Sequence, residues 1–171
     1  MSPPRRASSG PAAALNALRR LVQALRLSGM QAERETGLSG AQLFVLQQLA
    51  HAPAESLNEL AERTRTHQSS VSVVVTRLVG RGLVSRRRSD EDARRLVVEL
   101  TPAGRALAAR APVTAQAKLL RGLERLPARV LRTLHTSLER LADELGAPAG
   151  PPALFFEPPN EAASRPRRKA R

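Results

Sequence analysis

The sequence contains no Cys, no Trp and no Tyr, and only three Phe among its 171 residues. The absence of Cys excludes disulfides, Cys-ligated zinc or iron–sulfur sites, and redox sensing by thiols. No apolar run approaches the ~18 residues that a membrane-spanning helix needs, so we expect no segment that spans a membrane. The length predicts one domain with a substantial core, and an apolar content of 42% excludes a wholly disordered chain.

Acidic residues are also scarce relative to basic ones. The chain has 28 Lys and Arg against 15 Asp and Glu, a formal charge of +13. Such an excess favours an acidic partner, either nucleic acid or an anionic membrane surface. All but two of the basic residues are Arg, however, which is also what a general compositional bias would produce. The position of the charge along the chain has to decide between these interpretations.

Composition divides the chain into three zones. Residues 1–11 are mostly Ser, Pro, Gly and Arg and predict a disordered basic lead, whereas residues 12–145 are periodic and rich in Leu, Ala and Val. Residues 146–171 hold six of the 13 prolines and end in a basic cluster, which predicts a linker-like tail. Within that tail we expect Phe155 and Phe156 to dock on the body or on a partner subunit, the alternative being a stray pair in a linker.

The body begins with four predicted helices. Residues 12–30 have a helical apolar pattern, and Ser39 is a candidate N-cap for a second helix. Ser56 and Glu59 form a capping-box pattern that opens a short third helix, and after a polar break a fourth helix is expected over residues 68–81. The surface of the third helix, including Glu59, Glu62 and Arg63, is expected to be solvated.

The period then changes from helical to extended. Residues 83–88 and 95–100 predict two short strands around a polar turn, with Leu96, Val98 and Leu100 on one face of the second strand.

Helical signals return after the second strand. Thr101 and Pro102 are typical of a helix start, Pro112 should kink or break that helix, and Pro127 should be the first residue of a last helix that Gly146 ends. Four helices, a hairpin and further helices predict a mainly α winged helix-turn-helix fold with a two-stranded β wing.

The fourth predicted helix has a polar outer face. Short hydroxyl and amide side chains with one Arg suit close contact with base edges and phosphates, whereas the alternative is an ordinary solvated face. These candidate DNA-binding residues are Gln68, Ser69, Ser70, Ser72, Thr76 and Arg77.

The predicted hairpin concentrates guanidinium groups. A hairpin tip of this kind can place an Arg in a narrow minor groove, and Asp92 could orient an Arg there by a bidentate pair. Between positions 63 and 110 there are 11 Arg against four acidic residues, so more than half of the charge excess lies on this segment. The candidate arginines are Arg86, Arg87, Arg88, Arg94 and Arg95.

Several of these segments together resemble the multiple-antibiotic-resistance regulator (MarR) family. The resemblance is carried by Leu38-Ser-Gly-Ala-Gln-Leu-Phe-Val-Leu46, Ser56-Leu-Asn-Glu-Leu-Ala-Glu-Arg63, Gln68-Ser-Ser-Val-Ser72, Arg77-Leu-Val-Gly-Arg-Gly-Leu-Val-Ser-Arg86, Asp92-Ala-Arg-Arg95 and Val98-Glu-Leu-Thr-Pro-Ala-Gly104. The Asp-x-Arg-Arg wing followed by Leu-Thr-x-x-Gly is its most specific part. The likeness is continuous from about Leu38 to Leu107.

The resemblance implies a cytoplasmic homodimer that binds pseudo-palindromic double-stranded DNA and represses nearby genes. It implies that the helix from Gln68 enters the major groove, that Arg94 enters the minor groove and that Asp92 orients it. It also implies a small effector, often an anionic aromatic, although no Trp or Tyr is present here to stack on one.

In the same resemblance the DNA-binding region covers residues 38–101, and the dimer is made by helices within 12–35 and 102–145. Apolar seams in these helices agree with that role, because their spacing of three and four is typical of coiled coils. The seam residues are Leu15, Leu18 and Val22 in the first helix, and Leu131, Leu134, Leu138 and Leu141 in the last.

Other functions have weaker support in the sequence. An alternative is a winged-helix interaction or architectural protein that binds DNA or acidic partners without operator specificity. No metalloprotease, P-loop or dinucleotide motif is present, and the three His are isolated, so we predict no enzyme, no cofactor and no metal site.

Overall fold

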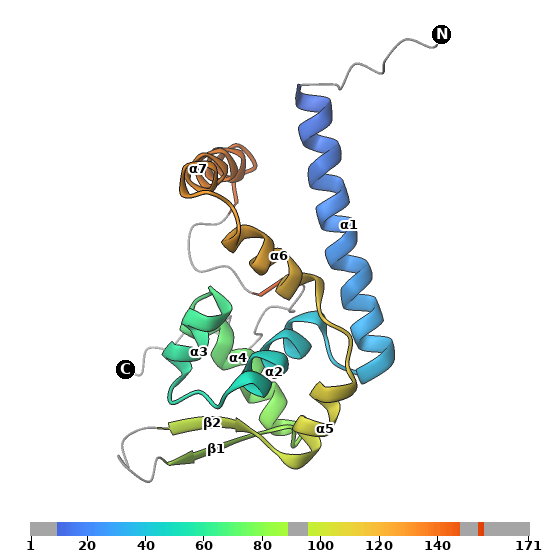
Figure 1. Cartoon of the computed structure of the whole chain (residues 1–171), viewed down its shortest axis with the longest axis vertical. Helices are drawn as coiled ribbons and strands as arrows, with labels where there is room; N and C mark the ends of the chain where they lie inside the picture. The colour runs from blue at the N-terminus through green and yellow to red at the C-terminus, as the bar shows by residue number, and fades with distance from the viewer. Residues whose placement is uncertain (1–9, 89–95, 148–153, 156–171) are drawn as a thin grey trace, which may run out of the picture.

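The computed structural model describes residues 10–88, 96–147 and 154–155. A long helix, α1 (Pro11–Thr36), runs along one side of the molecule and extends beyond the body (Figure 1). The body contains α2 (Gly40–His51), α3 (Leu57–Thr64) and α4 (Gln68–Gly80), followed by the antiparallel strands β1 (Val84–Arg88) and β2 (Leu96–Leu100). This order confirms the predicted winged helix-turn-helix. Within the described residues, no helix is both long and apolar enough to cross a bilayer.

Three further helices follow the strands. They are α5 (Pro102–Arg110), α6 (Ala115–Glu124) and α7 (Ala128–Glu144). The prediction that Pro112 breaks the chain is confirmed, because α5 and α6 are separate helices on either side of it. Pro127 precedes α7 as its N-cap rather than as its first residue, and Gly146 adopts a left-handed conformation with φ of 63° after the helix. In Figure 1, α6 lies between α1 and α7.

The helix starts follow the capping chemistry of the sequence. The Ser39 hydroxyl accepts a hydrogen bond from the Gln42 N–H, and Thr101 accepts one from the Gly104 N–H, both at 3.1 Å. Each bond satisfies one backbone donor that the first turn of a helix leaves unpaired. The predicted capping box at α3 is half right. The Ser56 hydroxyl accepts from the Glu59 N–H at 3.1 Å, but the Glu59 carboxylate accepts from the Glu55 N–H, one residue before the cap.

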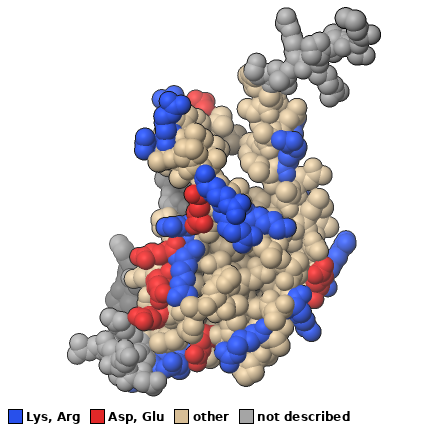
Figure 2. All heavy atoms as spheres, in the orientation of Figure 1, with Lys and Arg blue, Asp and Glu red and all other residues tan. Residues whose placement is uncertain are grey.

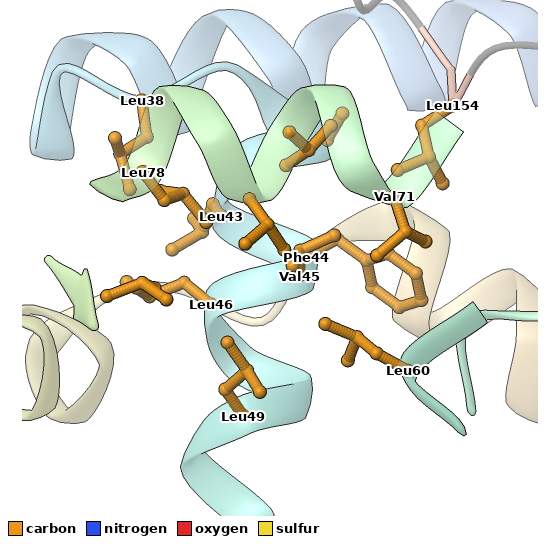
Figure 3. Close-up of a cluster of buried hydrophobic side chains, with 14 of the residues drawn as sticks. Leu38, Leu43, Phe44, Val45, Leu46, Leu49, Leu60, Val71, Leu78 and Leu154 are labelled. Carbon is orange, nitrogen blue, oxygen red and sulfur yellow. The ribbon is translucent and has the colours of Figure 1, made fainter. Parts of the chain in front are cut away.

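The core surrounds α2. Six of the 12 residues of this helix are buried, and Phe44, Leu43 and Leu46 are fully buried. Figure 3 shows these side chains meeting Val71 and Leu78 of α4 and Leu60 of α3. Each large apolar side chain removed from water contributes ~1.5–3 kcal/mol. The packing of three helices around Phe44 therefore holds the helix-turn-helix together.

The second strand is held on both of its edges. It pairs with β1 in the register Val84↔Leu100, and Ala54 forms an isolated bridge to Val98 on the other side. This bridge was not predicted from the sequence, because a single residue carries no strand pattern. Of the three residues predicted to share one face of β2, Val98 and Leu100 are buried, whereas Leu96 is 53% exposed. Leu96 lies at the outer end of the hairpin, beyond the reach of the core.

The base of the hairpin meets the start of α5 at Gly104. The Thr101 hydroxyl donates to the Gly82 carbonyl at 2.7 Å, and the Thr101 N–H donates to the Leu83 carbonyl at 3.1 Å. A Cβ placed on Gly104 would lie 2.0 Å from the Leu83 carbonyl oxygen. Only glycine permits this close approach of two backbones.

We expect Gly104→Ala to lower the free energy of unfolding by about 3 kcal/mol or more, because an added methyl group cannot fit against a backbone carbonyl. Urea unfolding followed by circular dichroism measures the change. Gly80→Ala is the matched control, since a Cβ at Gly80 in α4 meets nothing within 4 Å. That control should stabilise the protein by up to ~1 kcal/mol. Equal stability of the two variants would contradict the assignment.

A second prediction concerns the carboxylate of Glu59. Partial burial raises the pKa of Glu59, but hydrogen bonds from the Glu55 N–H and from Arg63, with the charge of Arg63, outweigh it and the net pKa lies below its ordinary value. A lowered pKa stabilises the fold above the unfolded-state pKa of ~4.3, and this contribution is lost as the pH falls through the folded-state pKa.

We therefore expect Glu59→Gln to lower the free energy of unfolding by ~1 kcal/mol at pH 7, and by progressively less below pH ~4.3. Denaturant titrations at several pH values measure the difference from the unchanged protein. Glu62→Gln, an exposed neighbour in α3, is the control. A pH-independent difference for Glu59→Gln would refute the role of the charge.

Candidate DNA-binding surface

Helix α4 has one buried face and one polar face. Val71, Val74, Val75 and Leu78 are buried against the core. On the polar face, Gln68, Ser69 and Thr76 are exposed, whereas Ser70, Ser72 and Arg77 are half-buried. All six candidate residues therefore lie on one helix, and three of them are exposed.

The turn between α3 and α4 sets the direction of that polar face. Arg65 adopts a left-handed conformation with φ of 52°, in which its N–H donates to the Glu62 carbonyl at 3.1 Å. The Thr66 N–H donates to the Ala61 carbonyl at 3.0 Å. These bonds close the end of α3 in the manner of a Schellman motif, although glycine usually occupies the left-handed position. The polar break is therefore a defined turn.

A hydrogen bond joins the wing to α4. The Arg86 guanidinium in β1 donates to the Thr76 hydroxyl at 3.0 Å, and that hydroxyl donates to the Ser72 carbonyl at 2.8 Å. Two candidate residues from separate elements are thus brought together, and Thr76 holds Arg86 beside the polar face of α4. The sequence contains no signal for this contact, because it depends on how the hairpin folds back on the helix.

The next arginine has a different environment. Arg87 pairs with Glu99 across the hairpin, with 3.2 Å between the guanidinium Nε and the carboxylate. Both side chains are partly exposed, so the pair contributes little to stability, but it offsets the charge of Arg87 at that face. Arg88 is exposed at the outer end of β1. The other wing residues, Asp92, Arg94 and Arg95, lie outside the described residues, and their roles remain predictions.

Several other arginines between positions 63 and 110 bind the protein's own backbone. Arg63 donates to the Ala52 and Pro53 carbonyls at 2.7 and 2.8 Å and pairs with Glu59, so the expectation that Glu59 and Arg63 are simply solvated was wrong. Arg81 donates to the Gly37 carbonyl, and Arg105 donates to the Leu100 carbonyl. The charge count over this segment therefore overstates the number of arginines that are committed to phosphate. Sequence spacing cannot distinguish these roles.

Acidic groups also interrupt the basic surface. Figure 2 shows Asp and Glu side chains beside Lys and Arg along the edge that contains α3, whereas basic side chains gather over α6. The α3 edge is therefore not a uniformly positive surface. This mixed charge makes the α3 edge poorly suited to contact with phosphate.

The apolar seams of the outer helices are largely uncovered. Leu15, Leu18 and Val22 are 42–46% exposed on α1, where they line a groove of about 480 Å³ with Leu27 and Met30. Helix α7 has no buried residue at all. On its seam Leu131, Leu138 and Leu141 are exposed and Leu134 is half-buried.

Comparison with known proteins identifies this arrangement. Residues 36–95 match the model of the MarR family. The transcriptional repressor Rv2887 of Mycobacterium tuberculosis strain H37Rv is 33% identical over 108 residues, which cover 63% of this chain and 78% of the repressor. The uncharacterised transcriptional regulator YdgJ of Bacillus subtilis is 35% identical over 80 residues, which cover 47% of this chain and 49% of that relative, so this chain spans about half of its length.

Solved structures agree at the level of the fold. The transcriptional regulator BldR of Sulfolobus solfataricus superposes with a TM-score of 0.51 and 25% identity, over 74% of this chain and 93% of that one. The PcaV regulator of Streptomyces coelicolor, solved with its natural ligand, gives a TM-score of 0.50 and 25% identity, over 85% of this chain and 99% of that one. With the polar face of α4, the hairpin beside it and the repressor relatives, these matches show that the chain belongs to the MarR family of DNA-binding transcriptional regulators.

Proposed function

We propose that this chain is a homodimeric repressor that binds a specific, pseudo-palindromic double-stranded DNA site. The observation that carries the proposal is the polar face of α4 with Arg86 of the wing fastened to it through Thr76. A helix and a hairpin held in one rigid unit can contact the major groove and the flanking backbone together. The repressor relatives support the regulatory direction of this activity.

In this proposal, α4 reads bases and the wing reads shape. Gln68 can pair with adenine in a bidentate way, and the hydroxyls of Ser69, Ser70 and Ser72 suit either bases or phosphates. Arg86 and Arg88 contact the backbone. The wing places Arg94 in the minor groove, where a narrow groove attracts guanidinium groups, and Asp92 orients it.

The proposed dimer covers the apolar seams of α1 and α7. Six of the seven seam residues are each more than one-third exposed, and burying them in a second copy would remove their apolar surface from water. A two-fold axis through these helices places two copies of α4 on one face. Their half-sites would then lie one or more helical turns apart, ~34 Å per turn.

A small effector is the finer part of the proposal. The structure of PcaV contains its natural ligand, and a ligand between the dimer helices and the body would change the distance between the two copies of α4. The second candidate, an architectural protein without operator specificity, shares the basic wing. The ratio of specific to random-duplex affinity separates the two, since a sequence-specific regulator reaches ~10³ or more.

We expect selection from a random DNA pool to return an inverted repeat, because a two-fold dimer presents the same helix to both half-sites. Sequencing of the bound fragments, followed by affinity measurements at a fixed salt concentration, tests this. Enrichment without a shared motif, with equal affinity for random duplex, would favour the architectural alternative.

The same selection with Gln68→Ala tests the role of α4. We expect specific affinity to fall about tenfold while random-duplex affinity stays the same, because one base contact contributes ~1–3 kcal/mol of discrimination. Gln31→Ala is the matched control, since Gln31 is exposed on α1 and bonds to Glu35. An unchanged motif and affinity for Gln68→Ala would remove this residue from the base-reading set.

For the dimer, we expect Leu134→Asp with Leu138→Asp to give a monomer, since two carboxylates on the seam cannot be buried without partners. Sedimentation or light scattering measures the mass in solution. Thr133→Asp with Thr136→Asp adds the same charge on the opposite face of α7, where both hydroxyls bond only within the helix, and should remain dimeric. A dimeric mass for the leucine variant would refute the α7 interface.

A further inference from the structure

Two residues of the C-terminal segment lie against the body. Leu154 is 5% exposed and belongs to the buried core cluster, whereas Phe155 is 48% exposed. Figure 3 shows Leu154 at the end of the cluster where Val71 of α4 lies. The expected docking of Phe155 and Phe156 is therefore modified: the buried anchor is the leucine before them, and Phe156 lies outside the described residues.

Phe155 borders a small cavity at the junction of three helices. The cavity is also lined by Leu25, Ser28 and Gly29 of α1, by Gly40 of α2, and by residues 114–116 at the start of α6. The space that remains beside Phe155 is about 10 Å³, no more than one water molecule needs. The half-exposed Phe155 ring thus lies at the opening of a site that is already nearly full.

Hydrogen bonds join the elements at and beside this junction. The Ala115 N–H donates to the Ser28 hydroxyl at 2.9 Å, and the Gln47 side chain donates to the Pro112 carbonyl at 2.8 Å. Helices α1 and α2 approach closely beside them, since a Cβ on Gly40 would lie 3.3 Å from the Gly29 Cα. Phe155 borders this junction, and Leu154, the residue before it, is buried in the core cluster.

We propose that Leu154 and Phe155 are a built-in occupant of this junction, and that a compact aromatic molecule enters the site only by displacing them. An occupant tethered by a short linker is present at an effective concentration in the millimolar range, which a free molecule has to exceed. Only eight residues, 146–153, separate Leu154 from Leu145 at the end of α7.

Displacement of this segment affects both parts of the molecule. Leu154 shares a buried cluster with Val71 of α4, and Phe155 borders the contact between α1 and α6. Removing the pair would uncover the inner side of α4 and the junction with the outer helices in one step. Displacement by a ligand rests on the proposed ligand response. Docking of Leu154 can be measured on the protein without DNA, so the docking and the ligand response can each fail independently.

The absence of native Cys makes the docking directly measurable. Full-length Leu154→Cys and Leu145→Cys are each treated with iodoacetamide, and alkylation is followed by mass spectrometry. Leu145 is the matched control, because it is 84% exposed. We expect Leu154→Cys to react at least about tenfold more slowly than Leu145→Cys, because reaction at the buried position requires local opening. Phe155→Cys should react at an intermediate rate, and equal rates for all three variants would overturn the docking.

Displacement is tested by adding 1-anilinonaphthalene-8-sulfonate, a compact aromatic probe. We expect the probe to raise the alkylation rate of Leu154→Cys toward that of Leu145→Cys, and to leave the control unchanged. Unchanged protection at a saturating probe concentration would overturn displacement. Leu154→Ser, which weakens the apolar anchor without truncation, should bind the probe more tightly than the unchanged protein, and equal affinity would also overturn it.

Discussion

The burial of α2 is the constraint on which the other elements depend. Helices α1, α3, α4, α5 and α6 and strand β2 all contact this one helix. Because interiors are closely packed, a helix covered on so many sides leaves little freedom in how its neighbours are placed. The turn after α3 and the glycine at the start of α5 act within this arrangement. They direct the polar face of α4 outward and bring the hairpin beside it.

Arginine has two distinct uses in this protein. Arg63, Arg81 and Arg105 bind backbone carbonyls of the body, where a planar guanidinium with several donors can hold loops and helix ends in place. Arg86 is instead held by Thr76 beside the polar face of α4. The high net charge thus combines structural arginines with a smaller group positioned for a partner. A basic count along the sequence measures the sum of the two groups.

The outer helices and the C-terminal segment differ in how their apolar surfaces are covered. The seams of α1 and α7 leave apolar side chains exposed in a single chain, whereas the apolar junction of α1, α2 and α6 is covered by residues of the same chain. Exposed seams favour a second copy as their partner, because long amphipathic helices are stabilised mainly by burying one face. The covered junction favours internal regulation. Both features link the outer helices to the position of α4.

The order of the elements could be predicted because its signals are local. Ser39, Thr101 and Gly146 determined helix ends by themselves, since a cap or a left-handed turn needs only neighbouring residues. The period change after Gly82 predicted the hairpin, and the assembled motifs indicated the MarR family. Gln68, Ser69, Ser72 and Thr76 share one face of α4 because a helical period of 3.6 places them within about 100° of one another. These parts of the fold and of the candidate site follow from the sequence alone.

Contacts between distant residues were decided only by the tertiary structure. The bond from Arg86 to Thr76, the bridge of Ala54 to Val98 and the backbone contacts of Arg63 join residues whose spacing carries no periodic signal. The sequence indicated the two phenylalanines as the docking residues, but the buried residue is Leu154. Which side chain of the segment is buried depends on the shape of the surface that it meets. The sequence by itself determined the helices, the hairpin and the polar face of α4. Tertiary packing decided which side chains from other elements lie beside the polar face of α4, because hydrogen bonds and close contacts depend on three-dimensional distance.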